Sequence, residues 1–183
     1  GTLSTRAAQR EGVSARAKFV KADIFESDFS KASVITMYLL PGLNLKLRPK
    51  LLEMKPGTRL VSHQFTMDDW QPDETSYFDF RPGYLWIVPA KTQGKWRIDA
   101  PGFSGLDMNF EQTFQRVKGD IELANSNLKV GLRETRLWGD QISFTAVDTR
   151  GVLREFTGRV AGDRMAGTVR TGNETAPWSA VKK

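Results

Sequence analysis

The sequence contains no cysteine and only one histidine. The lack of cysteine excludes disulfide bonds, thiolate catalysis and cysteine-based zinc sites. No segment approaches the ~18 consecutive apolar residues that a spanning helix needs, so we expect no membrane span. No Walker loop, Gly-x-Ser-x-Gly elbow or His-Glu-x-x-His motif occurs, which removes three common catalytic signatures. The acidic residues show no EF-hand spacing, and we predict no metal site.

The excess of positive charge is small, with 27 Lys and Arg against 21 Asp and Glu and a net charge of +6. These charges are spread thinly, whereas proteins that bind nucleic acid usually concentrate them on one face. We therefore expect no nucleic-acid partner. No signal peptide opens the sequence, which predicts a cytoplasmic location. Export is the alternative, because Gly1-Thr-Leu-Ser resembles an internal start and the natural N-terminus is not visible.

The first half of the sequence reads as alternating helices and strands. We expect a helix over residues 3–11, strands over 16–22, 33–40, 58–65 and 84–90, and a loop over 66–83. The run 33–40 is almost wholly apolar, which is typical of a parallel strand that is buried on both faces. Together these elements predict an α/β domain.

Apolar residues at helical spacing follow that strand. Leu43, Leu47, Leu51 and Met54 form one stripe over residues 42–55. Because proline disrupts the interior of a helix, Pro49 predicts a short turn over 42–47 and a helix that begins near Arg48.

The second half has a different pattern, in which short alternating segments are separated by glycine turns. We expect strands over 95–99, 109–118, 127–134, 141–147, 152–160, 165–171 and 178–181, with turns at Gly119, Gly139, Gly151 and Gly162. Short strands at regular spacing predict an all-β antiparallel barrel or sandwich. We place the boundary near residue 91, which gives an α/β part over 1–91 and a β domain over 92–183.

Four motifs occur in order: Ala22-Asp-Ile-Phe, Thr36-Met-Tyr-Leu-Leu-Pro, Leu45-Lys-Leu-Arg-Pro-Lys-Leu and Lys55-Pro-Gly-Thr-Arg-Leu-Val-Ser-His. On these motifs, residues 3–97 resemble class I S-adenosylmethionine-dependent methyltransferases, above all a bacterial branch similar to small protein-lysine methyltransferases. The resemblance implies a partial Rossmann-like sheet, S-adenosylmethionine as cofactor of the complete protein, and methyl transfer to a lysine or another amine. The acceptor would be a protein or a small molecule.

The glycine loop of that family is missing from this sequence. No two glycines stand two positions apart, so no Gly-x-Gly-x-Gly occurs. We therefore expect the loop to precede residue 1, and we expect this chain alone to be inactive.

The resemblance assigns cofactor contacts to two motifs. It implies that Asp23 accepts a hydrogen bond from the adenine amino group and that Ile24 and Phe25 pack on the adenine ring. It also implies that Tyr38 and Leu39 line the methyl-transfer cleft. A turn or helix cap is the alternative role of Asp23, because aspartate is common at such positions.

Substrate contacts are expected around the same cleft. Methyl transfer depends mainly on positioning of the nucleophile, and Tyr38 is the candidate catalytic residue because its hydroxyl can orient an amine. Leu40 and Pro41 would form walls, Asn44 would face the cleft, and His63 would accept a proton from the substrate. A packed core tyrosine and a structural histidine are the alternatives for Tyr38 and His63.

Three hypotheses remain open for the second half. The β domain is a binding module for an apolar ligand or a protein partner without catalysis, a selector of what the α/β part methylates, or a cover for an exposed sheet edge. A large apolar cavity would favour ligand capture, and a filled core would favour the cover. A homodimer through the open edge of the α/β sheet is a further expectation.

Overall fold

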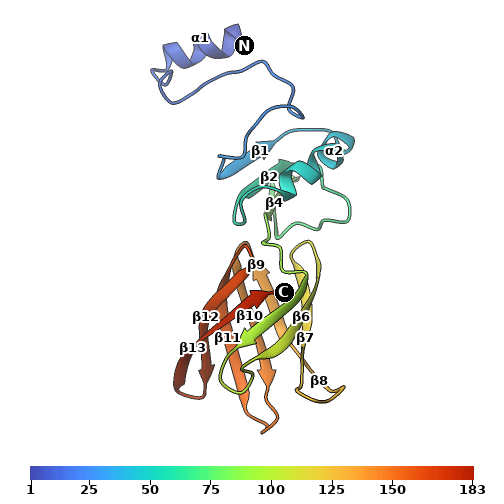
Figure 1. Ribbon diagram of the computed structural model, residues 1–183. Coiled ribbons are helices and arrows are strands. Elements are labelled where there is room, and N and C mark those ends of the chain that lie inside the picture. The colour runs from blue at the N-terminus through green and yellow to red at the C-terminus, as the bar shows by residue number, and fades with distance from the viewer. The chain divides into compact units, whose positions relative to one another are not determined.

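The computed structural model describes all 183 residues, and they form two compact units, 1–31 and 32–183, which are treated separately. In the first unit, helix α1 (Thr2–Arg10) is followed by turns and irregular backbone (Figure 1). The strand predicted over 16–22 does not form. Phe19 and Val20 are exposed and no strand lies beside them, and a strand without a neighbour cannot satisfy its backbone groups.

The second unit begins with a four-stranded sheet and one helix. Its elements are β1 (Val34–Met37), α2 (Pro41–Leu52), β2 (Arg59–His63), β3 (Glu74–Phe78) and β4 (Arg81–Ile87) (Figure 1). The strand order is β1-β2-β4-β3, in which β1 and β2 are parallel and the other pairs are antiparallel. The predicted parallel α/β arrangement is thus confirmed for β1 and β2. β1 lies at the edge of this sheet, so it is not buried on both faces as predicted, and only Met37 of its residues is buried.

Helix α2 is continuous, and the predicted turn over 42–47 was wrong. Pro41 occupies its first turn, where the missing N–H costs nothing. Pro49 lies inside the helix. The helix buries Asn44, Leu47 and Leu51 on one face, and this packing outweighs the cost of an interior proline, about 3 kcal/mol.

The segment predicted as a loop contains strand β3. Every residue of β3 is exposed, so the sequence offered no alternation of apolar and polar residues. The strand is held by its register with β4, from Glu74 opposite Leu85 to Phe78 opposite Arg81.

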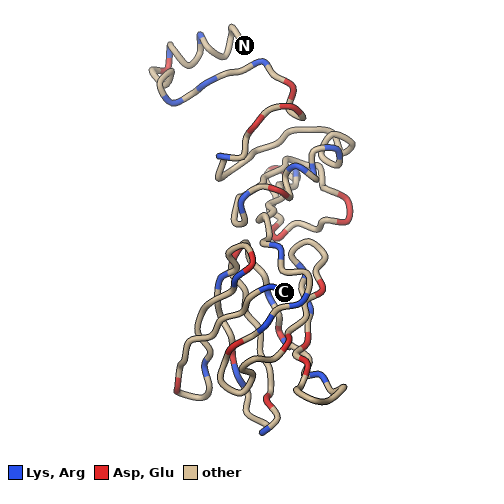
Figure 2. The backbone as a smooth tube through the Cα atoms, in the orientation of Figure 1, with Lys and Arg blue, Asp and Glu red and all other residues tan.

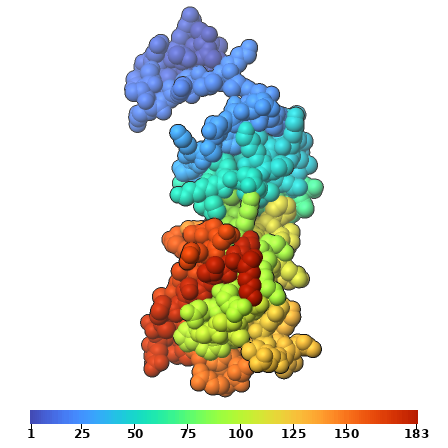
Figure 3. Space-filling model, in the orientation of Figure 1, coloured from blue at the N-terminus to red at the C-terminus, as the bar shows by residue number.

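The rest of the second unit is an antiparallel sheet of nine strands: β5 (Gly94–Asp99), β6 (Leu106–Thr113), β7 (Arg116–Glu122), β8 (Lys129–Gly131), β9 (Arg133–Trp138), β10 (Gln141–Val147), β11 (Leu153–Ala161), β12 (Arg164–Thr171) and β13 (Glu174–Lys182). The strand order is β8-β7-β6-β5-β13-β12-β11-β10-β9, and β7 also contacts β9, so the sheet curls into a nearly closed barrel. Figure 3 shows the red β13 beside the green β5, the pair that joins the two halves of this sheet. The predicted antiparallel β architecture is confirmed.

Aromatic side chains fill the inside of this sheet. Phe144 stacks on Phe156 with 4.6 Å between ring centroids, and Trp178 meets both rings edge-on. Phe103 and Phe110 extend the cluster, and all five are at least 97% buried. The centre of the barrel is therefore a packed core.

Two details of the predicted β pattern were wrong. Residues 109–118 form a hairpin instead of one strand, because Phe114 adopts a left-handed φ of 53° and reverses the chain without a glycine. Gly119 lies inside β7 instead of in a turn. A Cβ at this position would stand 2.3 Å from the carbonyl oxygen of Asn109, so the close approach of two strands requires glycine here.

Charges of both signs alternate over the outside of the barrel, as the blue and red segments in Figure 2 show. Asp107 pairs with Lys95, Arg97 and Lys183, and the pKa of its carboxyl is lowered, chiefly by the hydrogen bond from Lys183. Neither α1 nor α2 has the length and apolar character that crossing a membrane requires.

Candidate active site

The carboxyl ends of β1 and β2 bring two predicted site residues together. The strands are parallel, with Met37 opposite Ser62, so the residues that follow, Tyr38 and His63, lie at the same edge of the sheet. Their rings are 5.2 Å apart at an interplanar angle of 57°. Tyr38 is exposed and His63 is half-buried, so the tyrosine is not a packed core residue. A phenol and an imidazole are thus available to one ligand at this edge.

Helix α2 begins directly after Tyr38 and places the other predicted residues. Leu40 is its N-cap and is exposed, as is Pro41, while Leu39 is half-buried. These side chains therefore border the edge that carries Tyr38. Their contacts with a substrate stay predictions.

Asn44 lies beneath this edge and is completely buried. Its amide group donates long hydrogen bonds to Ser62 Oγ and to the carbonyl oxygens of Phe65 and Thr66, at 3.3–3.4 Å. Its Oδ1 has no hydrogen-bond partner. Asn44 thus ties α2 to the chain that follows β2, and its role in substrate binding stays a prediction.

Asp23 caps a local turn in the first unit. Its Oδ1 accepts a hydrogen bond from the Phe25 N–H at 2.8 Å, and its carbonyl oxygen accepts from the Ser27 N–H at 2.9 Å. Asp23 and Ile24 are exposed, whereas Phe25 is half-buried. One bond to Phe25 leaves the carboxylate with further acceptor capacity, so capping and contact with adenine are compatible. Asp23 does not end a strand, and its adenine contact stays a prediction.

The loop after β2 is fixed by α2. Gln64 and Asp68 adopt left-handed φ values of 68° and 58°, so the backbone bends sharply twice. The Arg48 guanidinium donates to the Met67 carbonyl oxygen at 3.0 Å and pairs with Asp69. The loop that leaves His63 is therefore anchored by Arg48.

The β6–β7 hairpin of the barrel also holds this loop. Phe114 stacks on the completely buried Trp70 with 5.6 Å between centroids, and Arg48 lies 5.3 Å from the Phe114 centroid. Gln115 accepts from the Trp70 indole at 3.1 Å and donates to the Gln71 carbonyl oxygen at 2.8 Å. The barrel thus supports the segment that follows the candidate site.

Asp73 ends this supported loop. Burial raises the pKa of its carboxyl, and hydrogen bonds from the Ile87 N–H and from Gln115 offset only part of that rise. The Ile87 N–H lies 2.7 Å from Asp73 Oδ2, which ties the loop to β4 as well.

Gln115→Ala is expected to lower the free energy of unfolding by about 1–3 kcal/mol, because it leaves the buried Trp70 indole N–H without an acceptor. Urea unfolding followed by circular dichroism measures the change. Gln141→Ala is the matched control, because Gln141 is exposed and its loss should stay within about 0.5 kcal/mol. Equal losses in both variants would contradict this account of the hairpin.

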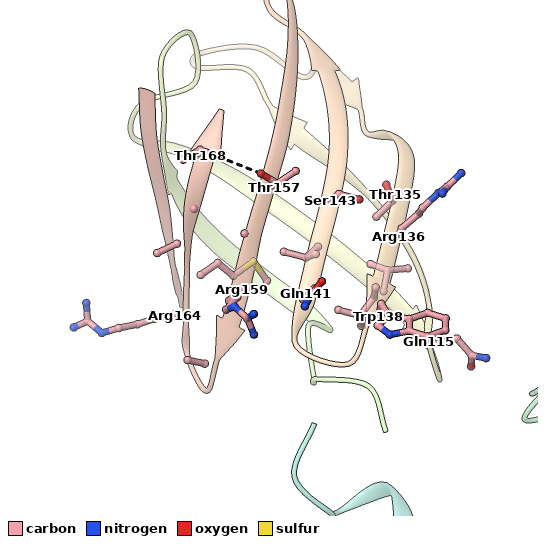
Figure 4. Close-up of a pocket in the computed structure, with 18 of the residues that line it drawn as sticks. Gln115, Thr135, Arg136, Trp138, Gln141, Ser143, Thr157, Arg159, Arg164 and Thr168 are labelled. Carbon is pink, nitrogen blue, oxygen red and sulfur yellow. Dashed lines mark hydrogen bonds between the residues drawn. The ribbon is translucent and has the colours of Figure 1, made fainter. Parts of the chain in front are cut away.

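A hollow of about 1340 Å³ lies over β9–β12 of the barrel and contains none of the predicted site residues (Figure 4). The residues labelled there include Arg136, Ser143, Thr157, Arg159 and Arg164. Arg136 and Arg164 point away to opposite sides, so the cations do not converge on one point. The hollow is open and the barrel interior is filled, so capture of an apolar ligand inside the barrel is not favoured.

The β3–β4 hairpin carries a feature that sequence reasoning missed. Tyr77, Phe78 and Phe80 are 74%, 88% and 98% exposed. The available signal was Tyr77-Phe-Asp-Phe, an aromatic cluster inside a stretch that reads as a polar loop. The pairing of His63 with Gly83 puts this hairpin tip at the same end of the sheet as Tyr38.

Comparison with known proteins assigns the first part of the chain. Residues 2–74 match the family of the ANTKMT methyltransferase domain. They are a class I methyltransferase segment. This segment includes β1, α2, β2 and every predicted site residue, so the expected family is confirmed.

Similar proteins agree with this assignment. A protein-lysine N-methyltransferase of Saccharolobus islandicus (strain REY15A) is 51% identical over 67 residues, which cover 36% of this chain and 42% of that protein. ATP synthase lysine N-methyltransferases of Rattus norvegicus and Homo sapiens are 31% and 33% identical over 48% and 55% of this chain. The matched regions cover 42% and 38% of those two proteins, so the chain spans less than half the length of these relatives.

One solved structure is also similar to the chain. It is an RNA methyltransferase from Salinibacter ruber in complex with S-adenosyl-L-homocysteine, with 41% identity and a TM-score of 0.48. The likeness covers 50% of this chain and 60% of that one.

Proposed function

We propose that the protein containing this methyltransferase segment transfers a methyl group from S-adenosylmethionine to a lysine side chain of a protein. The observation that carries the proposal is the edge formed by Tyr38 and His63 inside residues 2–74, which match a methyltransferase family. The curated relatives named as lysine methyltransferases support lysine as the acceptor.

The residues of the segment fit the adenine end of this cofactor. Asp23 offers an exposed acceptor for an amino group, and Ile24 next to it offers exposed apolar surface for a ring. The bound cofactor would supply an electrophilic methyl group on a sulfonium sulfur.

The segment's own residues would prepare the amine. A lysine ammonium has no free lone pair, so it must lose a proton before it attacks. His63 is in position to take up that proton, because an imidazole exchanges protons near neutral pH. The Tyr38 hydroxyl, beside it, would orient the neutral amine as a hydrogen-bond donor or acceptor. The C–S bond breaks as the N–C bond forms, and the product amine carries the positive charge until it loses a proton.

The barrel has a supporting role in this proposal. Phe114 and Gln115 hold the loop that follows His63, and the filled barrel core leaves no interior site for a ligand. The barrel therefore acts on the reaction through the position of residues 64–73.

Asp23→Ala in the full-length protein is expected to weaken S-adenosylmethionine binding roughly 5- to 150-fold, the effect of an unpaired polar partner at about 1–3 kcal/mol. Isothermal calorimetry measures the affinity. Asp28→Ala is the matched control, because Asp28 caps the next turn in the same way, through the Ser30 N–H at 2.9 Å. Unchanged affinity in Asp23→Ala would remove this residue from the cofactor site.

The acceptor is tested with tritiated S-adenosylmethionine, the full-length protein and a cell extract. Label that survives nuclease, is lost on proteolysis and migrates as methyl-lysine after hydrolysis is the expected result. Label that is lost on ribonuclease treatment, or found only in small molecules, would overturn the protein acceptor.

A further inference from the structure

The open edge of the four-stranded sheet continues into the candidate site. β3 ends the strand order, so nothing pairs with its outer side. All five of its residues are exposed. Arg81 and the turn before it have no partner on β2, so the aromatic tip of the hairpin projects past His63, where the parallel strands end. This edge and the Tyr38–His63 edge meet at one end of the sheet.

Backbone groups on this edge are free to accept another strand. The Gln64 N–H donates to the Pro82 carbonyl oxygen, so residue 82 of β4 faces β2 and its neighbours Arg81 and Gly83 face β3. Ser76 and Phe78 therefore pair with β4. Since backbone groups alternate along an antiparallel strand, those of Thr75 and Tyr77 point to the open edge.

The turn of the hairpin is built at a cost. Asp79 and Phe80 have φ values of 48° and 60°, the left-handed pair of a two-residue hairpin turn. Such turns favour Asn-Gly or Asp-Gly, because glycine adopts positive φ without strain. A phenylalanine there is strained and is also 98% exposed, so its ring gains almost nothing from packing within the chain. Strain of this kind is typical of functional sites.

We propose that the β3 edge binds an extended, apolar segment of the protein substrate as an added strand, with Tyr77, Phe78 and Phe80 in contact with its side chains. This rests on the proposed function and names how the acceptor protein docks. Alternating free N–H and C=O groups match an extended polypeptide, and the aromatic rings match apolar side chains. Because the tip projects past His63, a bound segment would carry a flanking lysine toward Tyr38.

Two variants separate docking from folding. Phe80→Gly relieves the strained turn, so it should raise the melting temperature by about 2–4 °C while it weakens docking. Thr75→Pro removes an outward N–H and blocks the edge, yet it leaves the pairs that Ser76 and Phe78 form with β4. Neither variant touches Tyr38, His63 or Asp23.

The probe is an array of peptides of about twelve residues with one central lysine, flanked by alternating Val and Thr, by Ser and Asn, or by Val and Pro. The full-length protein should be retained only on the Val-Thr peptides, and both variants should lose roughly tenfold or more of that affinity. S-adenosylmethionine affinity, measured in parallel, should not change. Failure of the proposed function would abolish methyl transfer and leave this peptide binding intact.

Three results would overturn the proposal. The first is equal binding of all peptide classes or no binding of any. The second is unchanged binding by both variants. The third is a different occupant: retention on phosphatidylcholine–phosphatidylglycerol vesicles, or a dimer in sedimentation that Thr75→Pro converts to a monomer, without Val-Thr peptide binding.

Discussion

Gly167→Ala is expected to unfold the barrel or to lower its free energy of unfolding by at least about 4 kcal/mol, a loss seen only when backbone or core cannot adjust. A Cβ at this position would stand 2.0 Å from the Thr157 carbonyl oxygen and 2.5 Å from the Gly158 Cα. Both contacts are backbone atoms of the paired strand β11, so the two strands would have to separate.

Gly158 and Gly167 stand opposite each other for a reason that involves Trp178. A Cβ on Gly158 would lie 2.8 Å from the Trp178 ring. The indole N–H donates to the Thr157 carbonyl oxygen at 2.9 Å, so the ring lies across β11. The glycine pair leaves the space in which this ring packs against the aromatic core.

Thermal unfolding followed by near-ultraviolet circular dichroism measures the effect, and a loss of 4 kcal/mol corresponds to about 8–16 °C in a domain of this size. Gly131→Ala is the matched control, because it lies in β8 and no atom would meet its Cβ within 4 Å. A melting temperature of Gly167→Ala equal to that of Gly131→Ala would show that β11 and β12 can move apart freely, contrary to this structure.

The second large effect is expected from Arg154→Leu, which should cost about 3–5 kcal/mol at neutral pH because it leaves the Asp148 carboxylate buried without its cation. The two side chains are 6% and 1% exposed and are joined by hydrogen bonds of 3.1 and 2.8 Å. Arg154 also donates to Thr171 at 2.9 Å, so one guanidinium ties the β10–β11 turn to β12.

Arg150→Leu is the control for this pair. Arg150 approaches the same carboxylate at 3.6 Å but is 72% exposed, and exposed pairs contribute about 0–1 kcal/mol. Urea unfolding of both variants at pH 7 measures the difference. Equal losses would mean that burial does not strengthen the Arg154 pair.

Acid should weaken the same pair. Burial by itself raises the pKa of Asp148, but hydrogen bonds from Arg154 and from the Val152 and Arg150 N–H groups outweigh it and lower the pKa from 3.8 to about 2. A lowered pKa means that the unfolded chain binds the proton more readily than the folded one. The contribution of Asp148 to stability is therefore complete above about pH 4 and is lost as the pH falls toward 2. Arg154→Leu should remove this part of the acid dependence.

The barrel was predictable where sequence and packing use the same pattern. β10 begins and ends where the alternation of Gln141–Val147 predicted, because its apolar residues Ile142, Phe144 and Ala146 all face the core. The turns at Gly139 and Gly162 were equally clear. Phe114 gave no such signal, because its left-handed backbone is stabilised by a stack on Trp70, which is 44 residues away in sequence.

The candidate site was predictable in part. The apolar run before Tyr38 and the strand before His63 predicted two parallel strands, and parallel strands bring their ends together. The strand before Asp23 was wrong because β propensity in Phe19 and Val20 does not supply a partner strand. The exposed hairpin was missed because a strand without a buried face has no periodicity to read.

The position of β13 between β5 and β12 has a consequence for synthesis. The meander β5–β8 and the meander β9–β12 are both complete in the chain before β13 is made, yet β13 is the strand that links them. Each meander must wait on the ribosome with one raw edge until residues 174–182 emerge. Ribosomes that stall within this last strand would therefore release two unsealed β ribbons, the form of nascent chain that chaperones have to shield.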